Sequence, residues 1–199
     1  MDVSVAGFLA LLALVGVLRL LELRISSRNR RGLLDRGIAP VRDPGFGWMV
    51  ALHAGVLAAA GLEVALLGRP FLPALGAAML ASLLLANGLR WWAIRALAHH
   101  WNVGVMASTS LGVVSSGPYR LVRHPNYAAV FVEMIALPLV HTAWVTALVA
   151  ASVHAVILKG RIAVEENALL ADPAYRAAMG ERPRFVPRWS DLSRRRAAG

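Results

Sequence analysis

Five apolar stretches, separated by polar and arginine-rich segments, make up most of the chain. The first three cover residues 3–23, 47–67 and 71–92, and each is about as long as the ~20 residues that a transmembrane helix needs. Two shorter stretches, 127–140 and 142–158, lie on either side of His141. We expect these two to form a helical hairpin in which each helix is extended by its polar flank. The pattern predicts an all-α integral membrane protein with about five transmembrane helices and a C-terminal helical hairpin.

The composition agrees with this prediction. Hydrophobic residues make up 58% of the chain and charged residues only 16%, against roughly 45–50% and about 25% in soluble domains. Basic residues follow the first apolar stretch instead of preceding it, and this stretch is longer than the apolar part of a signal peptide, so we expect a retained transmembrane helix. The chain has no cysteine, which excludes disulfides and thiolate chemistry. We also predict no metal site.

The basic residues predict the orientation in the membrane. They are concentrated in the connector 24–44, in the segment from Arg95 to Arg123, and in the region from Lys159 onward. Five crossings put all three segments on one side, which the positive-inside rule assigns to the cytoplasm. We therefore expect a multi-pass protein of the cell inner (plasma) membrane with its N-terminus outside and its C-terminus in the cytoplasm. Anionic membrane lipid, and not nucleic acid, is the partner that this explanation of the net charge of +10 implies.

A dense polar cluster stands where the fourth apolar stretch begins, in "SSGPYRLVRHPNYAAVFVE", residues 115–133. Proline at 125 suits the first turn of a helix starting near His124, so free backbone N–H groups would face a bound carboxylate. A second polar segment, "KGRIAVEENALL" (159–170), flanks the same hairpin. We expect the two segments to meet in space. Arg161 and Glu165 are four residues apart and share a helix face, whereas Glu166 is predicted to point elsewhere.

The combined cluster suits a ligand with a carboxylate, a positive charge and a flat ring. The basic side chains of Arg120, Arg123 and Arg161 favour the carboxylate, and Glu165 favours a cationic group. Tyr119 and Tyr127 offer aromatic faces. S-adenosylmethionine has all three features. Each residue also has a simpler explanation when it is considered alone. Arg120 and Arg123 could be positive-inside anchors, the tyrosines could be interfacial aromatics, and the Arg161–Glu165 pair could be an exposed ion pair.

Several polar residues lie inside the apolar stretches, where their cost predicts that they face the bundle interior. Glu133 is a candidate substrate-tunnel residue or makes a structural hydrogen bond. Arg19 and Glu22 are three residues apart and are expected to pair near the inner face of the membrane. We expect a structural role for His154, and we assign none to His53 and Glu63.

The paired motifs resemble those of the isoprenylcysteine carboxyl methyltransferase family of membrane enzymes. "SGPYRLVRHPNY", a hairpin and then "RIAVEENAL" occur in the order typical of that family. The resemblance covers residues 90–189 well and the first two apolar stretches only by hydropathy. "RWWAIRALAHHWN" (90–102) and "EMIALPLV" (133–140) look closer still to a bacterial branch that methylates long-chain alkylpyrones. Two features depart from the family: Ala129 replaces a frequent glycine, and the tail keeps Tyr175 but lacks a second tyrosine after it.

The resemblance implies an S-adenosylmethionine-dependent O-methyltransferase with a cytoplasmic cofactor pocket. Arg161 matches the substrate-side arginine of the family, so it and Glu165 are the catalytic candidates, and Glu133 is a second substrate-binding candidate. The cofactor-binding candidates are Leu111, Val113, Val114, Tyr119, His124, Pro125, Asn126, Tyr127 and Glu165. We expect one domain over residues 1–199, with three N-terminal spans in 1–92 and the catalytic region in 93–199.

The implied reaction is an in-line displacement at the sulfonium carbon, in which the enzyme mainly aligns two ligands and excludes water. The acceptor would be lipophilic, with either an alkylpyrone or polyketide hydroxyl or a prenylcysteine-like carboxylate. A second interpretation is an NADPH-dependent membrane reductase related to sterol reductases. A third is a non-enzymatic membrane scaffold or transporter.

Overall fold

The computed structural model describes residues 2–106 and 112–188 of the chain. These residues form helices and no strand, which confirms the all-α prediction. The helices are α1 (Val3–Leu34), α2 (Phe46–Leu67), α3 (Pro73–Leu97), η1 (Ala98–His100), η2 (Gly117–Arg120), α4 (Pro125–Leu139), α5 (Trp144–Leu169) and α6 (Pro173–Met179).

Four helices in the described part of the chain are long and apolar enough to cross a membrane: α1, α2, α3 with η1, and α5. This confirms a multi-pass membrane protein. Helix α4 has 15 residues, which is about 22 Å at 1.5 Å per residue and shorter than the ~30 Å hydrocarbon core. A fifth crossing by α4 and its flanks therefore stays a prediction.

Two helices extend into the polar segments beyond their apolar stretches. α1 was expected over residues 3–23 but continues to Leu34. Arginine and leucine are good helix formers, so the helix does not end where its apolar residues end. α5 continues beyond its apolar stretch, without a break, through Arg161 and Glu165, which confirms the predicted extension by its polar flank. The polar chemistry after residue 159 is therefore carried by the same rigid helix that packs in the bundle.

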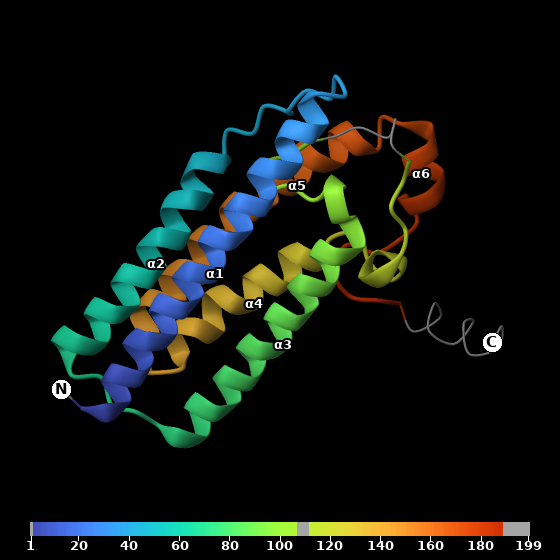
Figure 1. Cartoon of the computed structure of the whole chain (residues 1–199). Helices are drawn as coiled ribbons and strands as arrows, with labels where there is room; N and C mark the ends of the chain where they lie inside the picture. Colours follow the sequence, from blue (N-terminus) through green and yellow to red (C-terminus); the bar gives the residue numbers. More distant parts are fainter. Residues whose placement is uncertain (1, 107–111, 189–199) are drawn as a thin grey trace.

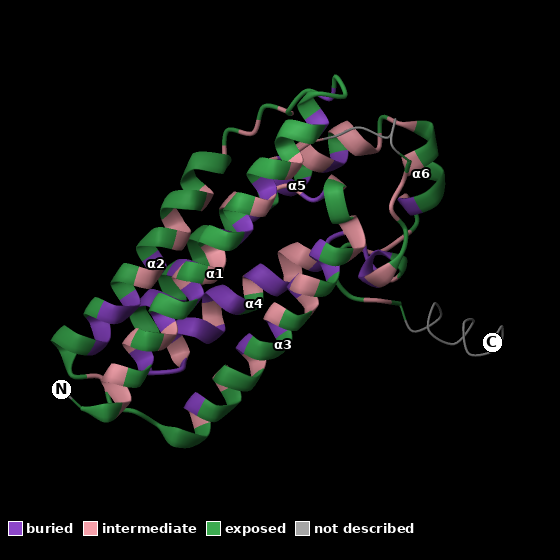
Figure 2. Ribbon diagram, in the orientation of Figure 1, coloured by how far each residue is buried: buried purple, intermediate pink, exposed green. Residues whose placement is uncertain are grey.

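Helix α4 lies at the centre of the bundle, against α3 on one side and α5 on the other, and α2 packs on α5 (Figure 1). Figure 2 shows α4 as the most continuously buried helix; Ala129, Met134 and Leu137 are almost fully buried. Apolar residues such as Leu85 and Val156, both 75% or more exposed, point outward from α3 and α5. Outward-facing apolar side chains of this kind are typical of helices that face lipid.

Glu63, which has no predicted role, caps the start of α5. Its carboxylate accepts hydrogen bonds from the backbone N–H groups of Val145 (3.1 Å) and Thr146 (2.7 Å) and pairs with Arg69 at 2.7 Å. An anion is favourable at the N-terminus of a helix because unpaired N–H groups and the helix dipole meet there. Glu63 is therefore a structural residue of the α2–α5 contact.

The arginine-rich segments gather at one end of the bundle. Figure 1 shows the α1–α2 connector, residues 112–124 before α4, and α6 at the end opposite the N-terminus and the α2–α3 turn. This arrangement is the one that the five-pass topology predicts.

Candidate active site

A cavity of about 560 Å³ lies at the arginine-rich end and continues between the helices. Its size falls in the range of roughly 300–1,000 Å³ that is common for small-molecule sites. Its polar end is lined by η2, the first turn of α4 and the end of α5. Its membrane end is lined by α1, α2 and the middle of α5. We define the polar end by Tyr119, His124, Asn126, Tyr127 and Glu165, and the membrane end by Leu20, His53, Leu57, Val130 and His154.

Gly117 sets the position of Tyr119. Its φ of +57° belongs to the left-handed region, and a Cβ there would lie 2.7 Å from the Cβ of Ala96 on α3, so only glycine fits without strain. The tight turn places Tyr119 against Ala93 and Met179. Burial, with a smaller effect from the charge of Glu165, raises the pKa of the Tyr119 phenol well above its usual range. Tyr119 is therefore a neutral, buried aromatic group on the cavity wall.

His124 and Pro125 start α4 as the sequence predicts, with His124 at the cap and proline at the first helical position. The His124 ring stacks on Tyr127 with ring centroids 5.3 Å apart. The backbone N–H groups of Arg123 and His124, which precede the helix, donate to carbonyl groups of the tail, at Pro183 and Arg184, both at 2.9 Å. The tail thus occupies the donors before the helix, and free N–H groups in the first turn of α4 itself stay a prediction.

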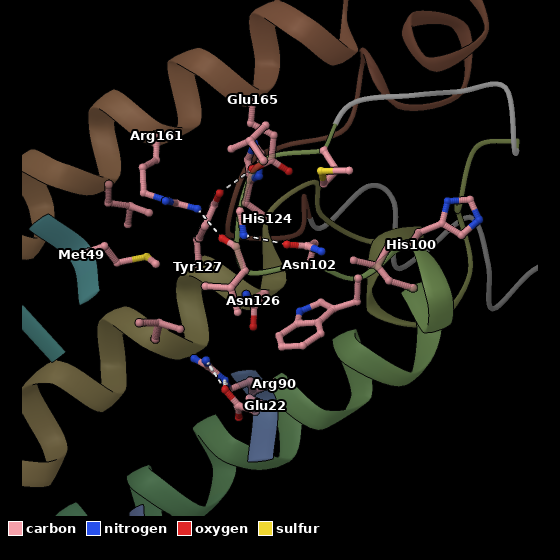
Figure 3. A pocket seen from close by; sticks show the side chains of 18 of the residues that line it. Glu22, Met49, Arg90, His100, Asn102, His124, Asn126, Tyr127, Arg161 and Glu165 are labelled. Atoms are coloured by element: carbon pink, nitrogen blue, oxygen red, sulfur yellow. Dashed lines mark hydrogen bonds and ion pairs between the residues drawn. The ribbon is translucent and has the colours of Figure 1, made fainter. Parts of the chain in front are cut away.

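Tyr127 and Glu165 come together at the polar end. The Tyr127 hydroxyl donates a 2.5 Å hydrogen bond to Glu165 Oε2; Figure 3 shows the two side chains pointing toward one another at the wall of the cavity. This bond joins the two motifs that are 38 residues apart in the sequence. Glu165 makes no ion pair with any described residue. It is therefore a half-buried carboxylate at the cavity without a cationic partner.

Glu166 points away from the face that Arg161 and Glu165 share, as predicted, because those two residues line the cavity and Glu166 does not. It is buried and contacts His124 at 3.0 Å, Arg123 at 3.3 Å and Arg184 at 2.6 Å. Successive residues on a helix differ by about 100°, so two neighbours can flank one contact surface. Glu165 faces the cavity, and Glu166 fastens the start of α4 and the tail to α5.

Arg161 lines the cavity and is already paired. Its guanidinium forms an ion pair with Asp43 of the α1–α2 connector and donates to the backbone carbonyl of Val103 at 2.8 Å. The Phe46 ring lies 5.9 Å from its guanidinium carbon. Only Nε of this buried side chain has no partner. Asp43 therefore neutralises the charge that was predicted to hold an anionic acceptor.

Glu133 lies in a buried charge cluster and not on the cavity wall. The cluster contains two arginines and two glutamates. Glu22 binds Arg19 (2.8 Å) and Arg90 (2.5 Å), as the spacing of Arg19 and Glu22 predicts. Glu133 lies 3.5 Å from Arg19 and 3.8 Å from Arg90. The structural role of Glu133 is thus the one that its contacts support, and a tunnel role is not. Figure 3 shows Arg90 and Glu22 together, away from Glu165.

The other predicted cofactor residues divide into three groups. Val113, Val114 and Asn126 line the cavity, and the buried side-chain oxygen of Asn126 has no hydrogen-bond partner. Pro125 is buried behind the wall as the helix start. Leu111 lies outside the described residues.

Sequence reasoning missed several cavity residues, including Tyr175, Met179, His53 and His154. Burial, together with the charge of Glu165, raises the pKa of the Tyr175 phenol to about 12. The two histidines carried a usable signal, because polar residues inside apolar spans usually face a functional interior. The described residues contain no group of three or more histidine or acidic side chains placed to hold a metal ion.

Residues 78–171 match the family model of the isoprenylcysteine carboxyl methyltransferase (ICMT) family. The chain is also similar to the uncharacterized protein YpbQ of Bacillus subtilis (strain 168), with 29% identity over 163 residues. That alignment covers 81% of this chain and 96% of YpbQ. The family match includes all of α4, most of α3 and both polar motifs.

Proposed function

The chain belongs, through residues 78–171, to the isoprenylcysteine carboxyl methyltransferase family, and from this premise we propose that it uses S-adenosylmethionine to methylate an oxygen of a lipophilic acceptor. Members of this family are membrane methyltransferases. The family match and the apolar helices together support that coarser assignment for this protein.

The observation that carries the proposal is the hydrogen bond between Tyr127 and Glu165. It brings the aromatic ring of Tyr127 and the carboxylate of Glu165, which has no cationic partner, to the same cavity wall. The two residues come from motifs that lie on either side of the helical hairpin. A sulfonium cation is favoured beside such a carboxylate, because an opposite charge stabilises it in a partly dry site. The neutral thioether that remains after transfer lacks this attraction, so Glu165 would favour the substrate form of the cofactor over the product form.

The remaining residues of the polar end also fit S-adenosylmethionine. The unpartnered oxygen of Asn126 can accept a hydrogen bond from an amino group. Tyr119 and Tyr127 can contact a ring, with Val113 and Val114 beside them. The cofactor supplies an electrophilic methyl group when it is bound. The protein's part is to bind, orient and keep water from the reacting oxygen.

The membrane end supports a lipophilic acceptor. Its wall contains Leu20, Met49, Val50 and Leu57, and Leu20 on α1 is 60% exposed. We infer that the cavity opens toward lipid beside Leu20, where an apolar tail enters from the bilayer. We propose Arg161 as a residue that orients the acceptor, and we favour a hydroxyl acceptor of the alkylpyrone or polyketide type over a prenylcysteine-like carboxylate. Asp43 compensates the charge of Arg161, which lowers its value for holding an anion.

We further propose that residues 1–199 form a single unit, because α1 and α2 line the same cavity as the family region. In this proposal α4 makes a fifth crossing, the polar end lies on the cytoplasmic side of the inner membrane, and the N-terminus lies outside. Reporter fusions at each terminus would test the orientation, and a cytoplasmic N-terminus would contradict it.

The function is tested with purified protein in detergent. S-adenosylhomocysteine should bind in a calorimetric titration, and NADPH should not. Incubation with methyl-labelled S-adenosylmethionine and a lipid extract of the host should label one lipophilic product. Glu165→Gln should lose this labelling, and Glu181→Gln, which changes an exposed tail residue, should keep it. Binding of NADPH instead would favour the reductase, and binding of neither ligand would favour a scaffold or transporter.

A further inference from the structure

Two histidines of the membrane end have no role in the function proposed above. His53 on α2 and His154 on α5 face one another edge-on, with ring centroids 5.8 Å apart and an interplanar angle of 80°. Both line the cavity. His154 is only 2% exposed, and neither of its ring nitrogens has a hydrogen-bond partner. Buried polar groups in folded proteins are almost always hydrogen-bonded, so this exception needs an explanation.

The hydrogen bond of His53 fixes which of its nitrogens is available. Nδ1 lies 2.7 Å from the backbone oxygen of Met49. A carbonyl oxygen only accepts, so Nδ1 carries the hydrogen, and in the neutral ring Nε2 is left as an acceptor. A neutral His154 adds one donor and one acceptor. The pair therefore offers two acceptors and one donor to a ligand in the cavity.

The position of the pair separates it from the polar end. His154, Leu158, Arg161 and Glu165 all line the cavity from one side of α5. The eleven steps along the helix from His154 to Glu165 correspond to about 16 Å at 1.5 Å per residue. The wall around the histidines is apolar and includes Leu57, Val130 and Leu158. On this part of the wall the histidines are neutral groups that can hydrogen-bond to a ligand, beside the paired charges of Arg19, Glu22 and Arg90, which also line the cavity.

Charge decides which oxygen group the pair can hold. The four arginines that line the cavity each contact a carboxylate: Arg19 and Arg90 contact Glu22, Arg123 contacts Glu166, and Arg161 contacts Asp43. Arg19, Arg90 and Arg161 therefore offer no uncompensated charge to an anion near the histidines. Arg123 lies at the polar end, where it shares Glu166 with Arg184. A carboxylate also only accepts hydrogen bonds, so it would oppose the lone pair of His53 Nε2. A neutral hydroxyl can donate to that nitrogen.

We propose, on the basis of the proposed function, that His53 and His154 bind the hydroxyl-bearing head group of the lipophilic methyl acceptor. The hydroxyl donates to Nε2 of His53, and the N–H of His154 donates to an oxygen of the same head group. The acceptor class is then a long-chain phenol or enol and not a carboxylate, and the histidine pair determines that specificity.

The test compares two probes that differ in one hydrogen-bond donor, 4-dodecylphenol and its methyl ether 4-dodecylanisole. Binding of each is titrated to the full chain in lipid nanodiscs, with S-adenosylhomocysteine present. The wild type should bind the phenol about five- to tenfold more tightly than the ether, which is the usual worth of one hydrogen bond. His53→Phe and His154→Phe should reduce this preference to near onefold. His154→Gln, which keeps a donor and an acceptor, should retain most of it. His99→Phe, at an exposed position outside the cavity, should retain all of it.

The affinity for S-adenosylhomocysteine is measured on the same samples. Unchanged affinity in the histidine variants shows that they fold and that only the acceptor site has changed. A wild type without preference for the phenol, or a His154→Phe variant that keeps it, overturns the inference. The inference is also overturned if His154→Phe loses binding to N-acetyl-S-farnesylcysteine, because this result would assign the histidine pair to a carboxylate acceptor. Failure of S-adenosylhomocysteine to bind the wild type would refute the proposed function and leave the phenol preference to decide the role of the histidines.

Discussion

The hydrogen bond between Tyr127 and Glu165 is expected to be worth about tenfold in cofactor affinity. At 2.5 Å the phenol donates to a half-buried carboxylate, and hydrogen bonds to charged groups contribute about 1.5–3 kcal/mol. Tyr127→Phe leaves the carboxylate without its orienting donor, and Glu165→Gln removes the charge. Since 1.4 kcal/mol corresponds to a factor of ten, each substitution should weaken S-adenosylhomocysteine binding about tenfold or more.

A double-mutant cycle separates this bond from the individual contacts of the two residues. The double variant should bind little worse than the weaker single variant, with a coupling free energy of about 1–2 kcal/mol. Isothermal titration in detergent gives the four affinities, and Glu181→Gln serves as the matched control on the exposed tail. Strictly additive losses would refute the reasoning, because they would mean that the bond does not organise the site.

The charge of Glu165 gives the same cycle a second readout. Only S-adenosylmethionine carries the sulfonium charge, so Glu165→Gln should weaken its binding more than that of S-adenosylhomocysteine. Tyr127→Phe should weaken both ligands to a similar degree. Equal losses for both ligands on Glu165→Gln would remove the proposed electrostatic role of this carboxylate.

Three further predictions follow from the buried charges and phenols. Asp43→Asn should free the charge of Arg161 and raise the affinity for N-acetyl-S-farnesylcysteine several-fold while leaving 4-dodecylphenol binding unchanged; no change for the carboxylate would mean that Asp43 does not control this arginine. Glu22→Gln should destabilise the protein by about 3–5 kcal/mol, because it leaves Arg90 buried without its closest counter-charge; a thermal unfolding shift no larger than that of Glu181→Gln would count against the cluster. Tyr175 has its pKa raised to about 12, so its contribution to stability should be complete below about pH 10 and lost as the pH rises toward about 12; Tyr175→Phe should flatten the loss of thermal stability in that window.

The helices could be predicted from the sequence because hydropathy acts over long stretches. Residues 47–67 were predicted and Phe46–Leu67 observed, and proline correctly marked the start of α4 at Pro125. The end of α1 could not be read from hydropathy, because Arg24 to Leu34 stay helical after the apolar residues stop. Helix propensity and hydropathy are separate properties of a residue. The run of apolar residues stops at the membrane surface, whereas residues that favour a helix continue beyond it.

The meeting of Tyr127 and Glu165 was predictable because both motifs flank one hairpin, and the hairpin leaves them little freedom. The partners of Arg161, Glu166 and Glu133 were not predictable in this way. Each depends on a segment that is distant along the chain: Asp43 in the first connector, Arg184 in the tail and Arg90 on α3. The sequence shows where charges of one sign cluster, but it does not show which opposite charge, distant along the chain, pairs with each of them in the fold.

The charge balance of the cavity links the choice of cofactor to the choice of acceptor. In the described part of the chain each arginine of the cavity contacts a carboxylate, with Arg123 and Arg184 sharing Glu166, and Glu165 is the carboxylate at the polar end that lacks an ion pair. A cation bound beside Glu165 would pair with its charge, whereas an anion bound deeper in the cavity would add an uncompensated charge near lipid, at a cost of several kcal/mol. The two ligands that suit this site are therefore one with positive charge and one that is neutral. A sulfonium donor and a lipophilic hydroxyl meet both conditions, and a carboxylate acceptor would first require Asp43 to release Arg161.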